Sequence, residues 1–161
     1  MNEKLARRER TPLDSDLIKL YSGRFLALAA DIPLLGRRVA PMGSAICRSP
    51  QCGAAVTVDI DVVDGRIARF SQDVKACALG QAAAAVVGAS AIGRSRGEIS
   101  QARDELAAML TEDSDAPHAP FGDLAVLRPA AAYRNRHASI LLSLDATLAA
   151  LDTIELKAQA D

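Results

Sequence analysis

The chain has 161 residues, half of them hydrophobic, and a formal net charge of −1. This length suits a single compact domain, and its core must be aliphatic because there are three Phe, two Tyr and no Trp. The near-neutral charge argues against a nucleic-acid partner, and the longest low-charge run, residues 78–93, is too short and too polar to span a membrane. No secretion signal is visible, so we expect a cytoplasmic protein.

The N-terminal region divides into a basic segment and a helix. Residues 1–15 are expected to form a flexible basic tail, residues 16–155 a single domain and residues 156–161 a short second tail. Apolar residues recur at helical spacing and predict an amphipathic helix over residues 16–30, with its apolar face made of Leu17, Leu20, Tyr21, Phe25 and Leu28.

The following region predicts three strands in an antiparallel meander. A short first strand is expected over residues 44–48, and Val56 to Val62 then alternate apolar with polar residues. This alternation predicts a half-buried strand whose aspartates, Asp59 and Asp61, lie on a solvated face. Asp64 and Gly65 supply a two-residue hairpin turn, and the third strand returns over residues 66–74.

The C-terminal half is predicted to be helical. A helix rich in small residues is expected over residues 78–91, and Ser95 and Glu98 form a candidate capping box for the next helix. A polar loop over residues 112–120 precedes a last helix, which is expected to begin near Pro129 or shortly after it. Its apolar stripe is made of His137, Ile140, Leu141, Leu144, Leu148 and Leu151. The fold class is therefore α+β, with a three-stranded antiparallel sheet and an N-terminal helix and several C-terminal helices packed on it.

Three cysteines are the residues most suited to chemistry. An odd number without a secretion signal argues against a disulfide framework. Cys52 falls in a tight turn between strands, and Cys77 falls at a helix start, where the helix dipole favours a thiolate. Two thiolates that converge at one end of the sheet would suit iron or zinc. The spacing of Cys52 and Cys77 by itself favours two unpaired buried thiols, and Cys47 is expected to pack in the core.

Four segments resemble the U-type iron–sulfur cluster scaffold family, which includes IscU, SufU and the N-terminal part of NifU. They are residues 20–22 (LYS), 49–53 (SPQCG), 75–82 (KACALGQA) and 137–141 (HASIL). The resemblance extends from about residue 16 to residue 150. The stretch between Cys77 and His137 is most similar to the SufU branch.

This resemblance implies both a function and a set of site residues. Members of the family hold zinc or a nascent [2Fe–2S] cluster, receive sulfur from a cysteine desulfurase and pass sulfur or cluster to iron–sulfur apoproteins. By resemblance, Cys52 and Cys77 are the acceptors of persulfide sulfur, and Cys52, Cys77 and His137 are the ligands of the cluster or metal. The protein is then a scaffold or carrier, and sulfurtransferase activity is the enzymatic alternative.

Two positions depart from the family pattern. Ala138 stands where the family has its third cysteine, and Ala54 stands where it has an aspartate. Because three ligands do not close a tetrahedral zinc site, binding of iron, zinc or a [2Fe–2S] cluster is expected to be weak, transient or absent. His137 can equally be a half-buried residue of an apolar helix stripe, and Ser139 can hydrogen-bond at the site. The alternative function is a binding protein that has lost cluster chemistry and docks a desulfurase or a client apoprotein.

Overall fold

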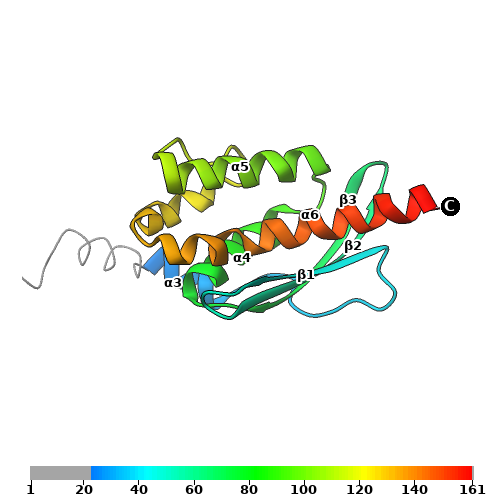
Figure 1. Cartoon of the computed structure of the whole chain (residues 1–161), viewed down its shortest axis with the longest axis horizontal. Helices are drawn as coiled ribbons and strands as arrows, with labels where there is room; N and C mark the ends of the chain where they lie inside the picture. Colours follow the sequence, from blue (N-terminus) through cyan, green and yellow to red (C-terminus); the bar gives the residue numbers. More distant parts are fainter. Residues whose placement is uncertain (1–22, 161) are drawn as a thin grey trace, which may run out of the picture.

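A computed structural model of the chain describes residues 23–160 and confirms the predicted α+β fold (Figure 1). The expected tail over residues 1–15 and the first part of the predicted N-terminal helix lie outside the described residues. The elements follow in the order α3 (Gly23–Ala30), β1 (Gly43–Ser49), β2 (Ala54–Val63), β3 (Arg66–Lys75), α4 (Ala78–Ser90), α5 (Arg96–Glu112), the 3₁₀ helices η1 (Gly122–Ala132) and η2 (Arg134–Arg136), and α6 (His137–Ala160).

The sheet is the predicted antiparallel meander, in the order β1-β2-β3. Asp64 and Gly65 both have positive φ, 53° and 74°, as a tight two-residue hairpin turn requires. Val58 and Ile60 of β2 are fully buried, so the alternation in the sequence places the core face correctly. No helix within residues 23–160 combines the length and the apolarity needed to cross a membrane.

The opposite face of the sheet differs from the prediction. Asp59 is fully buried and not solvated. It accepts hydrogen bonds from Arg37 Nε at 2.7 Å, from the Arg38 backbone N–H at 2.9 Å and from Ser44 Oγ at 2.5 Å. The loop that carries the two arginines runs beside β3, where Gly36 N–H donates to the Gln72 carbonyl at 2.8 Å. The alternation within β2 predicts which residues share a face of the sheet. It does not predict that the loop before β1 covers the face that carries Asp59.

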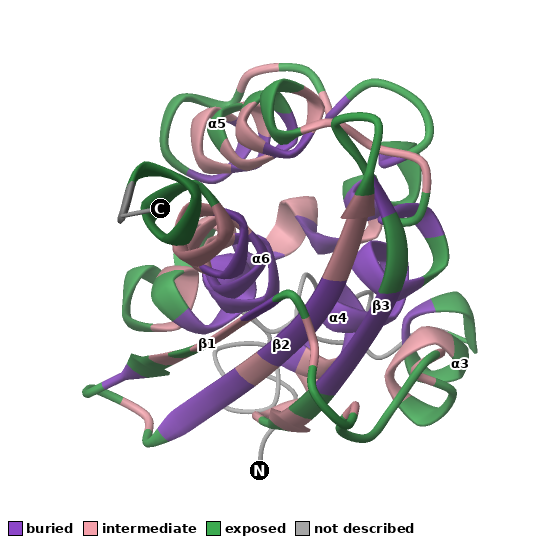
Figure 2. Cartoon of the chain, turned by 90° about the vertical axis from the view of Figure 1, so that its right-hand side faces the viewer, coloured by how far each residue is buried: buried purple, intermediate pink, exposed green. Residues whose placement is uncertain are grey.

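The helices form layers on the core face of the sheet (Figure 2). Helix α6 packs on β1 and β2, while α4 and α5 both pack against α6. Buried Gln72 of β3 ties these layers together, because its Nε2 donates to the Ala84 carbonyl of α4 at 2.8 Å and its Oε1 accepts from Ser143 of α6 at 3.0 Å.

The segment before α6 corrects a second expectation. The last α-helix begins at His137, and Pro129 lies inside the preceding 3₁₀ helix η1. Leu124, Leu127 and Ala130 are fully buried at intervals of three residues, which is the repeat of a 3₁₀ helix rather than of an α-helix. Residues 156–160, which were expected to be a tail, continue α6.

Helix α5 confirms its predicted start. The Ser95 side chain accepts a hydrogen bond from the Glu98 backbone N–H at 3.2 Å, and the Glu98 carboxylate accepts one from the Ser95 backbone N–H at 3.4 Å. Both halves of the capping box are therefore formed. This end of α5 follows the turn that leaves α4.

Candidate functional site

Cys52 lies in the turn between β1 and β2. Gly53 follows it with a φ of +69°, and the Gly53 N–H donates to the Ser49 carbonyl at 2.9 Å, which closes the turn. The turn places the Cys52 thiol beside the Ser49 hydroxyl, with a sulfur–oxygen distance of 3.3 Å. Ser49 itself is 1% exposed, so the thiol rests on a buried polar group at the end of the sheet.

The surroundings of Cys52 favour its thiolate. The hydrogen bond with Ser49 is the largest influence, and it lowers the pKa of the Cys52 thiol below the ordinary value for cysteine. Burial acts in the opposite direction, but the Ala54 backbone, the Ser139 side chain and the positive charge of Arg136 each lower the pKa further. A lowered pKa increases the fraction of the thiolate, which is the reactive form of the thiol.

Cys77 lies where β3 gives way to α4, as predicted. It is the N-cap residue of α4, and its side chain makes no capping hydrogen bond. Its Sγ lies 3.7 Å from Ser139 Oγ of α6. Ser139 is 1% exposed, and its side chain also lowers the pKa of Cys52. The two cysteines lie at the same end of the sheet, because Ala55, three residues after Cys52, pairs with Lys75, two residues before Cys77.

Gly80 explains how α4 reaches Ser139. A Cβ atom at this position would lie 2.7 Å from Ser139 Oγ and 2.7 Å from Ala76 Cβ, closer than real Cβ contacts. The glycine therefore permits the close approach of α4 to α6. The sequence pattern indicated Ser139 as a hydrogen-bonding residue but did not indicate that its partner is Cys77. The glycine three residues after Cys77 was the available signal.

His137 does not join the two cysteines. Its Nε2 lies 3.2 Å from the Ala130 carbonyl and 3.1 Å from the Ala131 carbonyl. Carbonyl oxygens can only accept, so Nε2 carries a proton and donates to them. Within residues 23–160 no group of three His, Cys, Asp or Glu side chains is placed to hold a metal ion. A ligand role for His137 stays a prediction.

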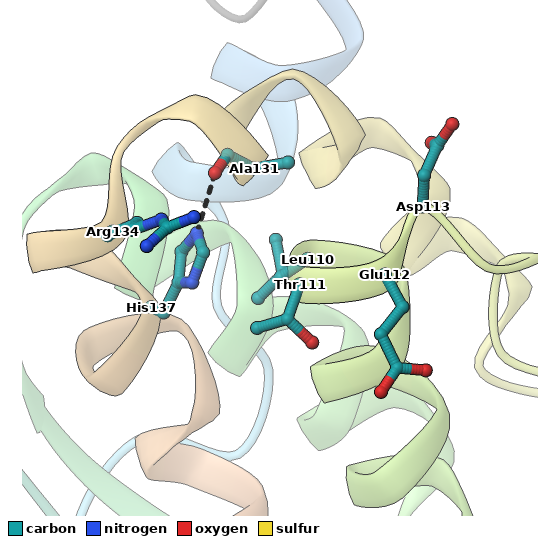
Figure 3. A pocket seen from close by; sticks show the side chains of 7 residues that line it. All are labelled: Leu110, Thr111, Glu112, Asp113, Ala131, Arg134 and His137. Carbon is teal, nitrogen blue, oxygen red and sulfur yellow. Dashed lines mark hydrogen bonds between the residues drawn. The ribbon is translucent and has the colours of Figure 1, made fainter.

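A pocket of about 640 Å³ adjoins His137 on the side of α5 (Figure 3). Neither Cys52 nor Cys77 lines it. Figure 3 shows the His137 ring beside Arg134, across from Leu110 and Thr111 near the end of α5.

Cys47 is separate from this site. It lies on the core face of β1, half-buried opposite Val56 and packed against the core. Burial raises the pKa of its thiol, and the negative charge of Asp145 on α6 raises it further. Cys47 is therefore less reactive than Cys52, which agrees with the packing role expected for it.

The two alanines that depart from the family pattern lie beside the thiol site. Ala138 is exposed and directly precedes Ser139 at the start of α6. Ala54 is 3% exposed and begins β2, two residues after Cys52. Methyl groups at both positions cannot bind a metal.

The chain resembles solved structures closely, although no protein-family model and no curated protein matches it. A SufU assembly scaffold of the SUF system from Fervidobacterium islandicum AW-1 is 18% identical with a TM-score of 0.73, covers 82% of this chain and 96% of its own, and shares the fold. These comparisons do not confirm a place in the SufU branch. The N-terminal part of a nitrogen-fixing NifU-like protein from Brucella abortus is 37% identical to this chain, with a TM-score of 0.85. The match covers 88% of this chain and 99% of the Brucella chain. The protein therefore belongs to the NifU-like, U-type family of iron–sulfur cluster scaffolds.

Proposed function

We propose that the protein is a cytoplasmic sulfur acceptor and scaffold that assembles or carries a transient iron–sulfur cluster through Cys52 and Cys77. The observation that carries this proposal is the position of the two cysteines at one end of the sheet, where Ala55, three residues after Cys52, pairs with Lys75, two residues before Cys77. Membership of a scaffold family supports it, because cysteine thiolates are the usual protein ligands of iron–sulfur clusters. The sulfur donor is a cysteine desulfurase, and the recipient is an iron–sulfur apoprotein.

Sulfur acceptance is an exchange at a persulfide. The Cys52 thiolate attacks the outer sulfur of the desulfurase persulfide, a new sulfur–sulfur bond forms on Cys52, and the desulfurase cysteine leaves as a thiolate. The lowered pKa of Cys52 supplies the nucleophile for this step. No oxidant is required, because the sulfur arrives already oxidised.

The cluster is cargo that the two thiolates would hold incompletely. A [2Fe–2S] cluster takes about four protein ligands, so two cysteines leave coordination positions for a small thiol, a second subunit or the receiving apoprotein. Zinc or iron bound at the same thiols would be held weakly for the same reason. This arrangement favours rapid release of the cargo over storage.

Anaerobic reconstitution with ferrous iron, cysteine, a desulfurase and dithiothreitol, which reduces persulfide sulfur to sulfide, tests the proposal. Wild-type protein should gain iron and acid-labile sulfide in equal amounts, whereas Cys52→Ser and Cys77→Ser should each lose both. Cys47→Ser is the matched control, because this cysteine faces α6 and lies outside the site. Retention of iron and sulfide in both site variants would overturn the proposal.

A second function is favoured by the alanines at positions 54 and 138. A protein that lacks these two ligands can keep the scaffold surface and dock a desulfurase or an apoprotein without handling sulfur. Binding to a desulfurase should then have the same dissociation constant in the double variant Cys52→Ser/Cys77→Ser as in the wild type. Loss of binding in the double variant would contradict this second function.

A further inference from the structure

We propose that Arg48, Lys75 and Arg136 form an electropositive docking surface around the two thiols, and that this surface binds an acidic region of the cysteine desulfurase. The inference rests on the proposed function. It adds which residues of this chain recognise the sulfur donor and which charge the donor must present. The desulfurase then approaches the thiols with acidic side chains facing the three cations.

Arg48 and Lys75 lie in one row at the end of the sheet. Ala55 of β2 pairs with Arg48 of β1 on one side and with Lys75 of β3 on the other. Residues that are paired directly across strands share a face, and this row shares the outer face with Asp59, four residues after Ala55. Both cations are exposed, and only the small side chain of Ala55 stands between them. The row therefore presents two positive charges beside the turn that carries Cys52.

Arg136 places a third positive charge on the helical side of the thiols. It is the last residue of η2 and lies three residues before Ser139, whose Oγ is 3.7 Å from Cys77 Sγ. The charge of Arg136 also lowers the pKa of Cys52, which packs against the core on the side of the sheet that the helices cover. The thiols therefore have cations on two sides, from the outer face of the sheet and from the start of α6.

The three cations have no acidic partner in the described part of the chain. Most arginines within residues 23–160 form ion pairs with Asp or Glu, and those that form none are Arg48, Arg69, Arg134 and Arg136. The three segments that carry the docking surface and both cysteines, residues 43–58, 74–97 and 124–144, contain no Asp or Glu. Gathered cations without acids create a positive potential that attracts an acidic partner.

Acidic side chains at the margins limit the docking surface. Asp73 shares the outer face with Lys75, and its negative charge raises the pKa of Arg37 in the loop that covers the sheet. Glu112 lines the pocket together with Arg134, so Arg134 lies beside an acid and is not part of the docking surface. The positive potential is therefore centred on the thiol end of the sheet.

Binding of a cysteine desulfurase from the same organism to the full chain tests the docking surface. Isothermal titration calorimetry at low and at physiological salt gives the dissociation constant. We expect the double variant Arg48→Gln/Lys75→Gln to bind about tenfold more weakly at low salt, and to lose less affinity than the wild type when salt is added, because two steering charges are gone. Arg69→Gln is the matched control and should bind like the wild type. Arg69 is another exposed, unpaired cation of β3, but it lies six residues before Lys75, toward the hairpin.

Equal affinity of the double variant and the wild type would overturn the inference, as would no binding to the wild type or an affinity that salt does not change. Binding of an RNA oligonucleotide that depends on Arg48 and Lys75, with unchanged desulfurase affinity, would assign the cations to nucleic acid instead. Circular dichroism and iodoacetamide alkylation of Cys52 show whether each variant is folded with its thiol accessible.

A persulfide assay on the same proteins separates this inference from the proposed function. Desulfurase binding that depends on the cations, without sulfur acceptance by the wild type, would refute the proposed function alone. Sulfur acceptance by the wild type, with desulfurase affinity and transfer rate unchanged in Arg48→Gln/Lys75→Gln, would refute the docking surface alone.

Discussion

Two polar clusters, one on the outer face of the sheet and one at its end, differ in how fully the hydrogen-bonding groups of their members are satisfied. On the outer face, buried Asp59 accepts hydrogen bonds from two side chains and a backbone N–H. At the end of the sheet, Cys52 and Cys77 are half-buried and depend on serine hydroxyls. A saturated buried group stabilises the fold, whereas a weakly partnered thiol stays available for chemistry.

The largest expected effect comes from adding the ligand that the thiol cluster lacks. Ala138 is exposed beside Ser139, so Ala138→Cys places a third thiol near the first two without disturbing the core. We expect zinc content after purification to rise to about one equivalent, because each thiolate adds strongly to zinc affinity. Metal analysis of the variant beside the wild type checks this, and Ala132→Cys, also exposed but at the end of η1, is the control. Equal zinc in both cysteine variants would contradict the account.

The outer cluster should respond in stability instead. Asp59→Ala removes a buried carboxylate and leaves three donors without their acceptor, which should lower the free energy of unfolding by about 3 kcal/mol. Urea denaturation measures this loss. Asp61→Ala is the control, since Asp61 is partly exposed and its replacement should lower the free energy of unfolding by less. A smaller loss for Asp59 than for Asp61 would contradict the structural role given to Asp59.

Asp59 also predicts a pH dependence. Burial by itself would raise the pKa of Asp59, but the hydrogen bonds from Arg37, Ser44 and the Arg38 N–H lower the pKa below its ordinary value. The contribution of ionised Asp59 to the free energy of unfolding is therefore complete above the unfolded-state pKa of about 4. It is lost as the pH falls through the lower folded-state pKa. Urea unfolding at neutral and strongly acidic pH should show a smaller difference in Asp59→Ala than in the wild type. An equal difference in the two proteins would mean that the pKa of Asp59 is not lowered in the folded state.

A smaller effect tests the close approach of α4 to α6. Gly80→Ala forces a methyl group against Ser139 and Ala76, and overpacking of this kind costs about 1–3 kcal/mol. Gly97→Ala in α5 is the control, because its nearest neighbour would lie 3.9 Å from the new methyl group. Thermal denaturation should show a lower Tm for Gly80→Ala and no loss for Gly97→Ala. A stable Gly80→Ala would mean that the two helices do not meet as described.

The smallest effect belongs to a region remote from both clusters. Ser95→Ala removes the side-chain half of the capping box of α5 and should cost about 1 kcal/mol. Sulfur acceptance should be unaffected, because Ser95 makes no contact with the thiol site. Urea denaturation and a persulfide assay on the same sample check both statements, and a loss of sulfur acceptance equal to that of a cysteine variant would contradict them.

The sequence predicts local features better than it predicts contacts between distant segments. The hairpin turn at Asp64 and Gly65 and the capping box at Ser95 depend on neighbouring residues, and both are confirmed. The start of α6 was predicted too early, near Pro129, because a proline is typical of the first turn of an α-helix, whereas Pro129 lies inside the 3₁₀ helix η1. The burial of Asp59 was missed because its cover comes from a loop about twenty residues earlier in the chain.

The site shows the same division. The positions of Cys52 in a turn and of Cys77 at a helix start follow from local patterns and are confirmed. The contact of Cys77 with Ser139 depends on the packing of α4 against α6, and no local pattern predicts it. The direction of His137, toward the carbonyls of η1, depends likewise on how η1 folds back on the start of α6.

The central claim is that Cys52 and Cys77 form the sulfur-handling site. Mass spectrometry of the protein after brief anaerobic incubation with a cysteine desulfurase and cysteine tests it most directly, with persulfides trapped by alkylation and mapped to individual residues. The account predicts added sulfur first on Cys52, then on Cys77, and none on Cys47, whose pKa is raised by burial. Added sulfur on Cys47 in preference to the other two, or on no cysteine at all, would contradict it.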